Sequence, residues 1–226
     1  HTQTITVEDN TAPSFNEALP GDDTVECDDI PAANTLTASD NCDTSVNVIF
    51  EEQIIDGSCP SDYTVIRTWT VEDCAGNTNS HIQTINVQDT SAPIVVRPAS
   101  DQTVMCDGSG NSNELQTWLD TNAGANAVDV CGTVTWTNDF TGLIDECGST
   151  GFALVSFTAT DDCGNATNTT ALFTILDLTP PALQGKPTNE VIECGPNSDV
   201  TLQNWLDSNG GATATDSCGD VTWTNN

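Results

Sequence analysis

Alternation of apolar and polar side chains is the main pattern along this chain. Residues 63–71 read YTVIRTWTV and alternate aromatic or β-branched residues with Thr, and residues 152–160 repeat the pattern with Phe157 in the place of Trp69. A period of two predicts β-strands with one buried face. Arg67 falls on the same face as Trp69, so either it lies near a sheet edge or the register shifts locally.

The sequence also repeats itself over the length of a domain. HTQTITVEDNTAPSF at 1–15 recurs as HIQTINVQDTSAPIV at 81–95, and a third copy reads ALFTILDLTPPAL at 171–183. The aligned aspartates, which set periods of 80 and 88 residues, are Asp9, Asp89 and Asp177. These periods are too long for solenoid units. Short strands divided by Asn, Asp, Gly and Pro clusters predict an all-β chain of tandem immunoglobulin-like β-sandwich domains.

The repeats set the expected domain boundaries. We expect a first repeat of short form at 10–89 and a second repeat of long form at 90–177. Residues 1–9 read as the last strand of a preceding repeat, and residues 178–226 as the N-terminal part of a further long-form repeat. The sequence is therefore expected to start and stop within an array.

The long form differs by an inserted segment, NSNELQTWLDTNAGA, that predicts one short helix. Leu115, Trp118 and Leu119 share one helical face, residues 111–112 offer a cap, and Gly124 ends the helix. The equivalent residues in the third repeat are Leu202, Trp205, Leu206 and Gly210. We expect both tryptophans to plug the side of the sandwich, with sugar stacking as the alternative.

Composition narrows the class of partner and compartment. The 226 residues include 3 Lys or Arg against 34 Asp or Glu, and a net charge of -31 argues against nucleic acid and anionic membranes as partners. No apolar run reaches the roughly 18 residues that a membrane span requires. Ten Cys with two His favour disulfides over zinc, which indicates an oxidising, extracellular or cell-surface location.

Catalytic constellations are missing from the sequence. His1 and His81 occupy equivalent strand positions in successive repeats, and no Ser or Cys nucleophile has a plausible base partner. Glu51 and Glu52 are neighbours in a strand, so their side chains point to opposite faces and cannot flank one glycosidic bond. We expect the chain not to be an enzyme.

Strand topology predicts how the cysteines pair. Cys27 and Cys59 fall at one pole of a sandwich and Cys42 and Cys74 at the other, because Cys27 to Cys42 and Cys59 to Cys74 each span 15 residues, one strand apiece. We predict Cys27 with Cys59 and Cys42 with Cys74, while sequential pairing of Cys27 with Cys42 and Cys59 with Cys74 stays open. The same logic predicts Cys106 with Cys147, Cys131 with Cys163, and partners after residue 226 for Cys194 and Cys218.

Acidic loops carry the remaining candidate chemistry. Each repeat gathers two loops and the arriving linker at one pole, and oxygen-rich clusters without His suit Ca²⁺. A structural Ca²⁺ there would fix the angle between repeats, although Asp and Asn are also ordinary turn residues. The candidate ligands are Asp9, Asp40, Asp43, Asp73 and Asn77 in the first repeat, Asp89, Asp129, Asp161, Asp162 and Asn165 in the second, and Asp177 and Asp216 in the third.

Several of these segments resemble a known family. TLTASDNC, YTVIRTWTVEDCAGN and QTINVQDTSAP look like hyalin-repeat-like (HYR-like) immunoglobulin-type modules of large Bacteroidota cell-surface proteins, including gliding-motility adhesins. WLDTNAGA, VTWTN and FTATDDCGNATNT resemble a longer subtype. The resemblance covers essentially the whole chain. It implies an adhesin stalk or surface filament exported across the outer membrane, often by the type IX pathway, and no catalysis.

The combined expectation is a structural stalk or filament segment that extends an adhesive region. Its partners would be neighbouring repeats of the same chain, surface polysaccharide or other cells, and further chains if filaments assemble laterally. The alternatives are a carbohydrate- or cell-binding module and the spacer of a secreted hydrolase.

Overall fold

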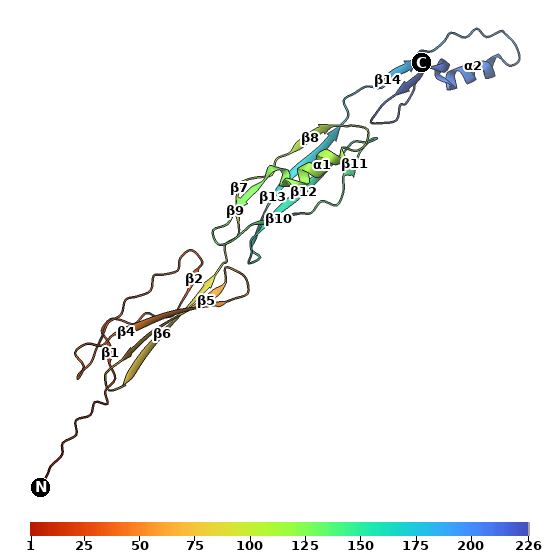
Figure 1. The fold of residues 1–226 in the computed structure, drawn as a ribbon. Coiled ribbons are helices and arrows are strands. Elements are labelled where there is room, and N and C mark those ends of the chain that lie inside the picture. Colours follow the sequence, from red (N-terminus) through yellow and green to blue (C-terminus); the bar gives the residue numbers. More distant parts are fainter. Residues whose placement is uncertain (226) are drawn as a thin grey trace. The chain divides into compact units, whose positions relative to one another are not determined.

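Strands dominate the computed structural model, which describes residues 1–225 (Figure 1). The chain divides into two units, and the first comprises His1–Ile94 together with Ala127–Thr135 and Ala159–Thr167. The second unit takes the remaining segments. Two loops of the second repeat therefore cluster with the first repeat. Within residues 1–225, no helix has both the length and the apolar character to span a membrane.

The first repeat is a β-sandwich of one larger and one smaller sheet. The larger sheet has the order β2-β6-β5-β4, with β2 parallel to β6 and the other pairs antiparallel. Its strands are β2 (Asp23–Glu26), β4 (Val48–Asp56), β5 (Tyr63–Glu72) and β6 (Thr78–Gln88). The smaller sheet pairs β1 (Ser14–Phe15) with β3 (Ala38–Ser39). The predicted all-β sandwich architecture is confirmed.

Burial along β5 follows the predicted alternation. Val65, Trp69 and Val71 are buried, and the indole Nε1 of Trp69 donates to the Asn34 carbonyl at 3.0 Å. Burying a large aromatic ring is favourable when its polar N–H also finds a partner. The alternation in the sequence therefore located the core face of this strand correctly.

Arg67 is the exception on that buried face. It is only 5% exposed, and its Nε donates to Glu52 Oε2 at 2.8 Å. Glu52 lies directly opposite Arg67 in the β4–β5 register. Arg67 does lie near a sheet edge, because β5 is the strand next to the edge strand β4, whereas the alternative of a local register shift is wrong. The guanidinium is accommodated by an ion pair across the sheet.

The second repeat has the same strand order as the first. Its sheet runs β10-β12-β13-β8, with β8 parallel to β13 and β11 paired to β12, while β7 pairs with β9. The strands are β7 (Ile94–Arg97), β8 (Gln102–Met105), β9 (Asn126–Val128), β10 (Thr135–Asn138), β11 (Ile144–Asp145), β12 (Gly151–Thr160) and β13 (Ala166–Leu176). The third repeat contributes the antiparallel pair of β14 (Ala182–Gly185) and β15 (Thr213–Thr215).

The predicted helices are present between the equivalent strands. They are α1 (Ser112–Asp120) and α2 (Ser198–Asp207), each followed by a short 3₁₀ turn, η1 (Asn122–Gly124) and η2 (Asn209–Gly211). Asn111 precedes α1 but does not cap it, because its side chain turns inward. Its Oδ1 accepts from the Asp107 N–H at 3.2 Å and its Nδ2 donates to the Met105 carbonyl at 2.9 Å.

Trp118 fixes α1 to the sandwich. The indole is 3% exposed, with ring centroids 5.2 Å from Phe157 and 5.3 Å from Phe173. Its Nε1 donates to the Ser100 carbonyl at 3.0 Å, and Trp205 on α2 makes the equivalent bond to Thr188 at 3.0 Å. The plug predicted at Trp118 is confirmed, and this ring is covered rather than available for stacking on a sugar. Trp205 is only half-buried, and no residue of α2 is buried, so the plug predicted there is not formed within residues 1–225.

Truncating this plug tests its structural role. Trp118→Ala removes a buried ring and its hydrogen bond, so we expect the free energy of unfolding to fall by about 3–5 kcal/mol. Urea unfolding followed by circular dichroism measures the loss. Gln116→Ala on the exposed face of the same helix is the control and is expected to change stability by less than about 0.5 kcal/mol. Equal, small effects of both substitutions would contradict the assignment.

Candidate functional site

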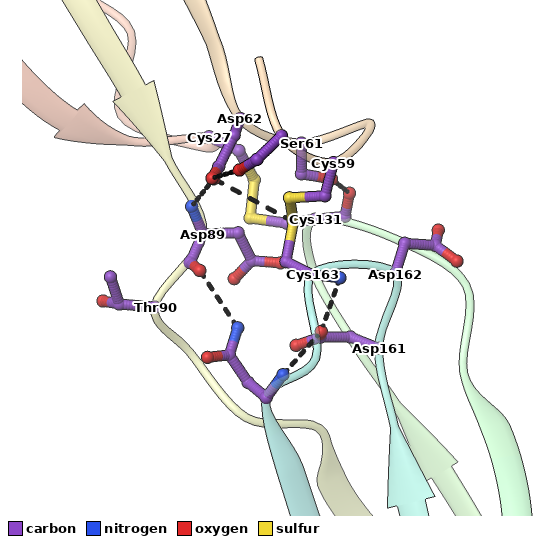
Figure 2. Close-up of a disulfide and its surroundings, with 12 residues drawn as sticks. Cys27, Cys59, Ser61, Asp62, Asp89, Thr90, Cys131, Asp161, Asp162 and Cys163 are labelled. Atoms are coloured by element: carbon purple, nitrogen blue, oxygen red, sulfur yellow. Dashed lines mark hydrogen bonds between the residues drawn. A yellow bond between two sulfur atoms is a disulfide. The ribbon is translucent and has the colours of Figure 1, made fainter.

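Disulfides join each repeat to the next one along the chain. The three bonds are Cys27–Cys131, Cys59–Cys163 and Cys106–Cys218, with Cα separations of 5.8, 5.2 and 6.0 Å. These separations lie in the usual range for cystines. Two of the bonds meet at one junction between the first and second repeats (Figure 2). The cysteines are therefore joint elements and not internal braces of a single sandwich.

The pairings predicted from topology are wrong. Those were Cys27 with Cys59, Cys42 with Cys74, Cys106 with Cys147, and Cys131 with Cys163; the sequential alternatives do not form either. Cys27 follows β2 and Cys59 precedes β5, and both strands meet the same end of β6, so the predicted pole was correct. Placing two cysteines at one pole does not decide whether they bond each other or the next repeat.

The expectation for Cys218 is also wrong, whereas a partner after residue 226 for Cys194 stays a prediction. Cys218 bonds Cys106, so its expected partner after residue 226 is not needed. Within residues 1–225 the free cysteines, all exposed, are Cys42, Cys74, Cys147 and Cys194.

A short loop of the first repeat contacts the bonded loops of the second. The Ser61 hydroxyl is buried and donates to the Cys131 carbonyl, and Asp62 Oδ1 accepts from the Asp89 N–H at 3.0 Å (Figure 2). At the next junction the Cys218 carbonyl accepts from the Ser149 N–H at 2.7 Å. Sequence reasoning missed Ser61 and Asp62, because no periodicity or repeated motif marks them before the disulfide pairing is known.

Glycine is required where the second junction is tightest. Gly148 has φ of 63°, and a Cβ atom there would lie 1.9 Å from the Cys218 carbonyl oxygen. Close backbone approach of this kind excludes every other side chain.

The linker between the first and second repeats is held from both sides. Asn165 Nδ2 donates to the Asp89 carbonyl at 3.0 Å. Glu26 accepts from the Thr90 hydroxyl at 2.6 Å and from the Thr90 N–H at 3.1 Å, and these two bonds lower the pKa of Glu26. At the preceding linker Asn77 Nδ2 donates to the Asp9 carbonyl at 3.2 Å. The linker backbone is therefore fixed by side chains of two repeats.

One carboxylate oxygen of each loop aspartate shapes the turn around a cysteine. Asp129 Oδ1 accepts from the Cys131 N–H at 2.8 Å, and Asp161 Oδ1 accepts from the Cys163 N–H at 2.8 Å. The equivalent bonds are Asp40 to Cys42 at 2.8 Å and Asp216 to Cys218 at 2.9 Å. The alternative interpretation of these residues as turn formers is correct for this oxygen.

The second oxygen of several carboxylates is buried without a hydrogen-bond partner. The atoms are Asp9 Oδ2, Asp40 Oδ2, Asp89 Oδ2 and Asp161 Oδ2, and the last two residues are each 6% exposed. Buried anionic oxygens without partners are costly. Burial raises the pKa of Asp89, and the charges of Asp129 and Asp161 add to the shift. Burial also acts on Asp161, but hydrogen bonds from Asn165 outweigh it and lower the pKa of Asp161.

One group of closely spaced acidic side chains lies at each of three linkers, around Asp9, Asp89 and Asp177. In each group two carboxylate oxygens and one cysteine sulfur lie within 4.8 Å of one another. The groups are Asp9, Asp40 and Cys42; Asp89, Asp129 and Cys131; and Asp177, Asp216 and Cys218. A disulfide sulfur is not a thiolate, so at the second and third groups the donors are oxygens. Such a donor set suits a hard cation such as Ca²⁺ and not zinc.

The other predicted ligands already have hydrogen-bond partners. Asp43 Oδ2 accepts from the Cys74 N–H at 2.9 Å, whereas Asp162 accepts from the Thr133 N–H at 2.9 Å and hydroxyl at 2.8 Å, which lower the pKa of Asp162. All three bonds tie one loop to another. The Asn77 side chain donates to Asp73 at 2.8 Å and lowers the pKa of Asp73.

Comparison with known proteins gives a family match for part of the chain. A family model described as "HYR-like domain with 4 cysteines" matches residues 15–87, which confirms the resemblance for the first repeat. No curated protein matches the chain.

Solved structures with some likeness belong to cadherins and immunoglobulin-type modules. They include Drosophila N-cadherin EC1-4, mouse Cadherin-23 EC22-24 and the Ig1-2 module of the Drosophila receptor protein tyrosine phosphatase DLAR, at 16%, 11% and 9% identity and TM-scores of 0.29, 0.29 and 0.26. They match 74%, 79% and 74% of this chain, and the chain covers 50%, 71% and 100% of theirs. The chain thus spans half of the N-cadherin structure, and the fold assignment rests on the strand order above.

Removal of one bond between repeats tests the pairing. The double substitution Cys59→Ser and Cys163→Ser should lower the free energy of unfolding by about 2–5 kcal/mol, because the crosslink restricts the unfolded chain. Guanidinium unfolding measures this, and mass spectrometry of unreduced peptides should find Cys27 joined to Cys131. The matched control, Cys74→Ser with Cys147→Ser, removes two free thiols and should leave stability unchanged within about 0.5 kcal/mol. Peptides that join Cys27 to Cys59 would contradict the pairing.

Proposed function

We propose that this chain is a load-bearing segment of an extracellular adhesion protein, a stalk or filament whose joints are locked by disulfides and by Ca²⁺. The observation that carries the proposal is that successive repeats are bonded to each other rather than internally. Disulfides persist in oxidising compartments, which supports a location outside the cell. The likeness of residues 15–87 to HYR-like domains supports the same class. As the finer assignment we propose a surface adhesin of the gliding-motility type.

These disulfides would transmit a pulling force from one repeat to the next. A pull that reaches Cys27 passes to Cys131 through covalent bonds, without unfolding the strands between them. A second bond, Cys106–Cys218, overlaps the first along the sequence. The crosslinks therefore form a covalent route from one repeat to the next that is independent of sandwich packing.

Calcium is the proposed second lock. The unpartnered oxygens of Asp89 and Asp161 need a positive charge, and Asp129 adds another carboxylate beside Asp89. In a chain of net charge -31 no Lys or Arg supplies it, because the 3 basic residues are Arg67, Arg97 and Lys186. A Ca²⁺ bound to oxygens from the linker and loops would neutralise the cluster and hold the linker to the loops.

Pulling single chains by their ends tests the load-bearing role. In the oxidised chain the shortest covalent path crosses Cys27–Cys131, returns to Cys106 and crosses Cys106–Cys218, so the fully stretched length should be about 200 Å from roughly 60 residues. With a reducing agent the same chain should reach about 750–800 Å. Identical lengths in both conditions would refute the covalent route.

Calcium binding is tested by thermal melting of the full chain. We expect millimolar Ca²⁺ to raise the melting temperature and Mg²⁺ to have a smaller effect, because Ca²⁺ accepts more oxygen ligands in irregular geometry. Asp89→Asn should remove the part of the Ca²⁺-dependent rise in melting temperature that comes from the junction between the first and second repeats. In EDTA the same substitution should raise the melting temperature, because it removes a buried charge that disfavours the fold. Asp145→Asn, the same change at an exposed carboxylate, is the control. A wild-type melting temperature insensitive to Ca²⁺ would leave the aspartates as turn formers.

The pH dependence of the Asp89 effect follows from the direction of its pKa shift. A carboxyl whose pKa is raised in the folded state costs no stability below its unfolded pKa, and the cost is complete above its folded pKa. In EDTA, Asp89→Asn should therefore be more stable than wild type at neutral pH, and the difference should vanish below about pH 4. Melting temperatures of both proteins across this range measure it. A difference that grows on acidification would contradict the assigned shift.

A further inference from the structure

The observed disulfides follow one connection rule. Each complete repeat has four cysteines, which we number first to fourth in chain order: Cys27, Cys42, Cys59 and Cys74, then Cys106, Cys131, Cys147 and Cys163. A first cysteine bonds the second cysteine of the following repeat, as in Cys27–Cys131 and Cys106–Cys218. A third cysteine bonds the fourth of the following repeat, as in Cys59–Cys163.

This rule accounts for the free cysteines as well. Cys42 and Cys74 are the second and fourth cysteines of the first repeat, so they occupy the positions that receive bonds. Cys147 is a third cysteine and Cys194 a first cysteine, so they occupy the positions that give bonds. All four are exposed.

The loop around Cys42, which we call the receiving face together with the loop of Cys74, has the same contacts as the loops around the bonded Cys131 and Cys218. The Cys42 N–H donates to Asp40 Oδ1 at 2.8 Å, the same contact that positions the bonded Cys131 and Cys218. The linker residue Asp9 accepts from the Thr11 N–H at 3.1 Å, as Asp89 accepts from Ser91 at 3.2 Å. These loops therefore hold the geometry of a junction.

The loop of Cys74 completes this face. Asp43 Oδ2 accepts from the Cys74 N–H, which ties the loop of Cys74 to the loop of Cys42. Asn77 Nδ2 reaches the Asp9 carbonyl, as Asn165 reaches Asp89 at the bonded junction. Both receiving cysteines therefore stand beside the same linker.

We propose that Cys42 and Cys74 are a two-point covalent docking site for a further copy of the repeat, which binds through its first and third cysteines. The partner is defined by its chemistry: two cysteines spaced like Cys27 and Cys59, with an equivalent of Glu26 before the first and of Ser61 and Asp62 after the third. Those residues hold Thr90, Asp89 and Cys131 at the bonded junction. By the same rule Cys147 and Cys194 bond the fourth and second cysteines of later copies.

Each bond requires an oxidant, which we specify as a disulfide such as oxidised glutathione. Two thiols and one oxidised glutathione give one protein disulfide and two reduced glutathiones, and the two protons move to the departing thiolates.

A chain lengthened by one repeat tests the proposal. Residues 1–89 are placed before residues 10–226, so that an added copy of the first repeat precedes the original one. After refolding with a glutathione redox buffer, we expect four free thiols, the same number as in the 226-residue chain, despite four more cysteines. Mass spectrometry should join the added Cys27 to the original Cys42, and the added Cys59 to the original Cys74. In the control, Cys27→Ser with Cys59→Ser in the added copy, the number of free thiols should rise to six.

Other outcomes overturn the proposal. Eight free thiols would mean that the added copy does not dock, and a bond between Cys42 and Cys74 of one repeat would mean that these thiols serve each other. Linked pairs of separate chains would place the partner in another polypeptide. The proposal rests on the pairing at the bonded junctions and deepens the proposed stalk role. Thiol mapping does not depend on Ca²⁺ or on extension under force, so either idea can fail alone.

Discussion

Bonds from one repeat to the next organise the molecule around its junctions. Cys27–Cys131 and Cys59–Cys163 bring two loops of the second repeat against the first, so those loops cluster with it. In this arrangement the Ser61 hydroxyl of the first repeat donates to the Cys131 carbonyl of the second. The strands themselves are ordinary sandwich strands, and what distinguishes the chain is chemistry concentrated where repeats meet.

The disulfide-bonded loops also bring several negatively charged carboxylates close together. The turns that position the cysteines need aspartates, and each such aspartate carries a second oxygen into the same small space. Hydrogen bonds from Asn165 and nearby N–H groups stabilise part of the negative charge on the buried Asp161 carboxylate. Asp89 accepts only one such bond, from the Ser91 N–H, and burial together with the charges of Asp129 and Asp161 outweighs it, so its pKa moves in the opposite direction. Covalent closure and electrostatic strain are thus built from the same residues.

Much of the fold could be predicted from sequence because local patterns determine it. Alternation located the buried face of β5, and the spacing of Leu115, Trp118 and Leu119 located α1 and its contact face. The Arg67 ion pair could not be foreseen, because its partner lies on another strand in a register that the sequence does not state. The disulfide pairing failed for a related reason. Spacing within a repeat is identical whether a cysteine bonds its own repeat or the next, so only the three-dimensional junction distinguishes the two.

The long sequence separation of the bonded cysteines affects how the chain can mature. Paired residues lie 104 or 112 positions apart, so a repeat cannot close its joints until most of the next repeat has been synthesised. During that interval Cys27 and Cys59 stay reduced at the same end of a folded sandwich and are exposed to mutual oxidation. Productive maturation must therefore proceed in order along the chain, with thiol–disulfide exchange correcting premature bonds.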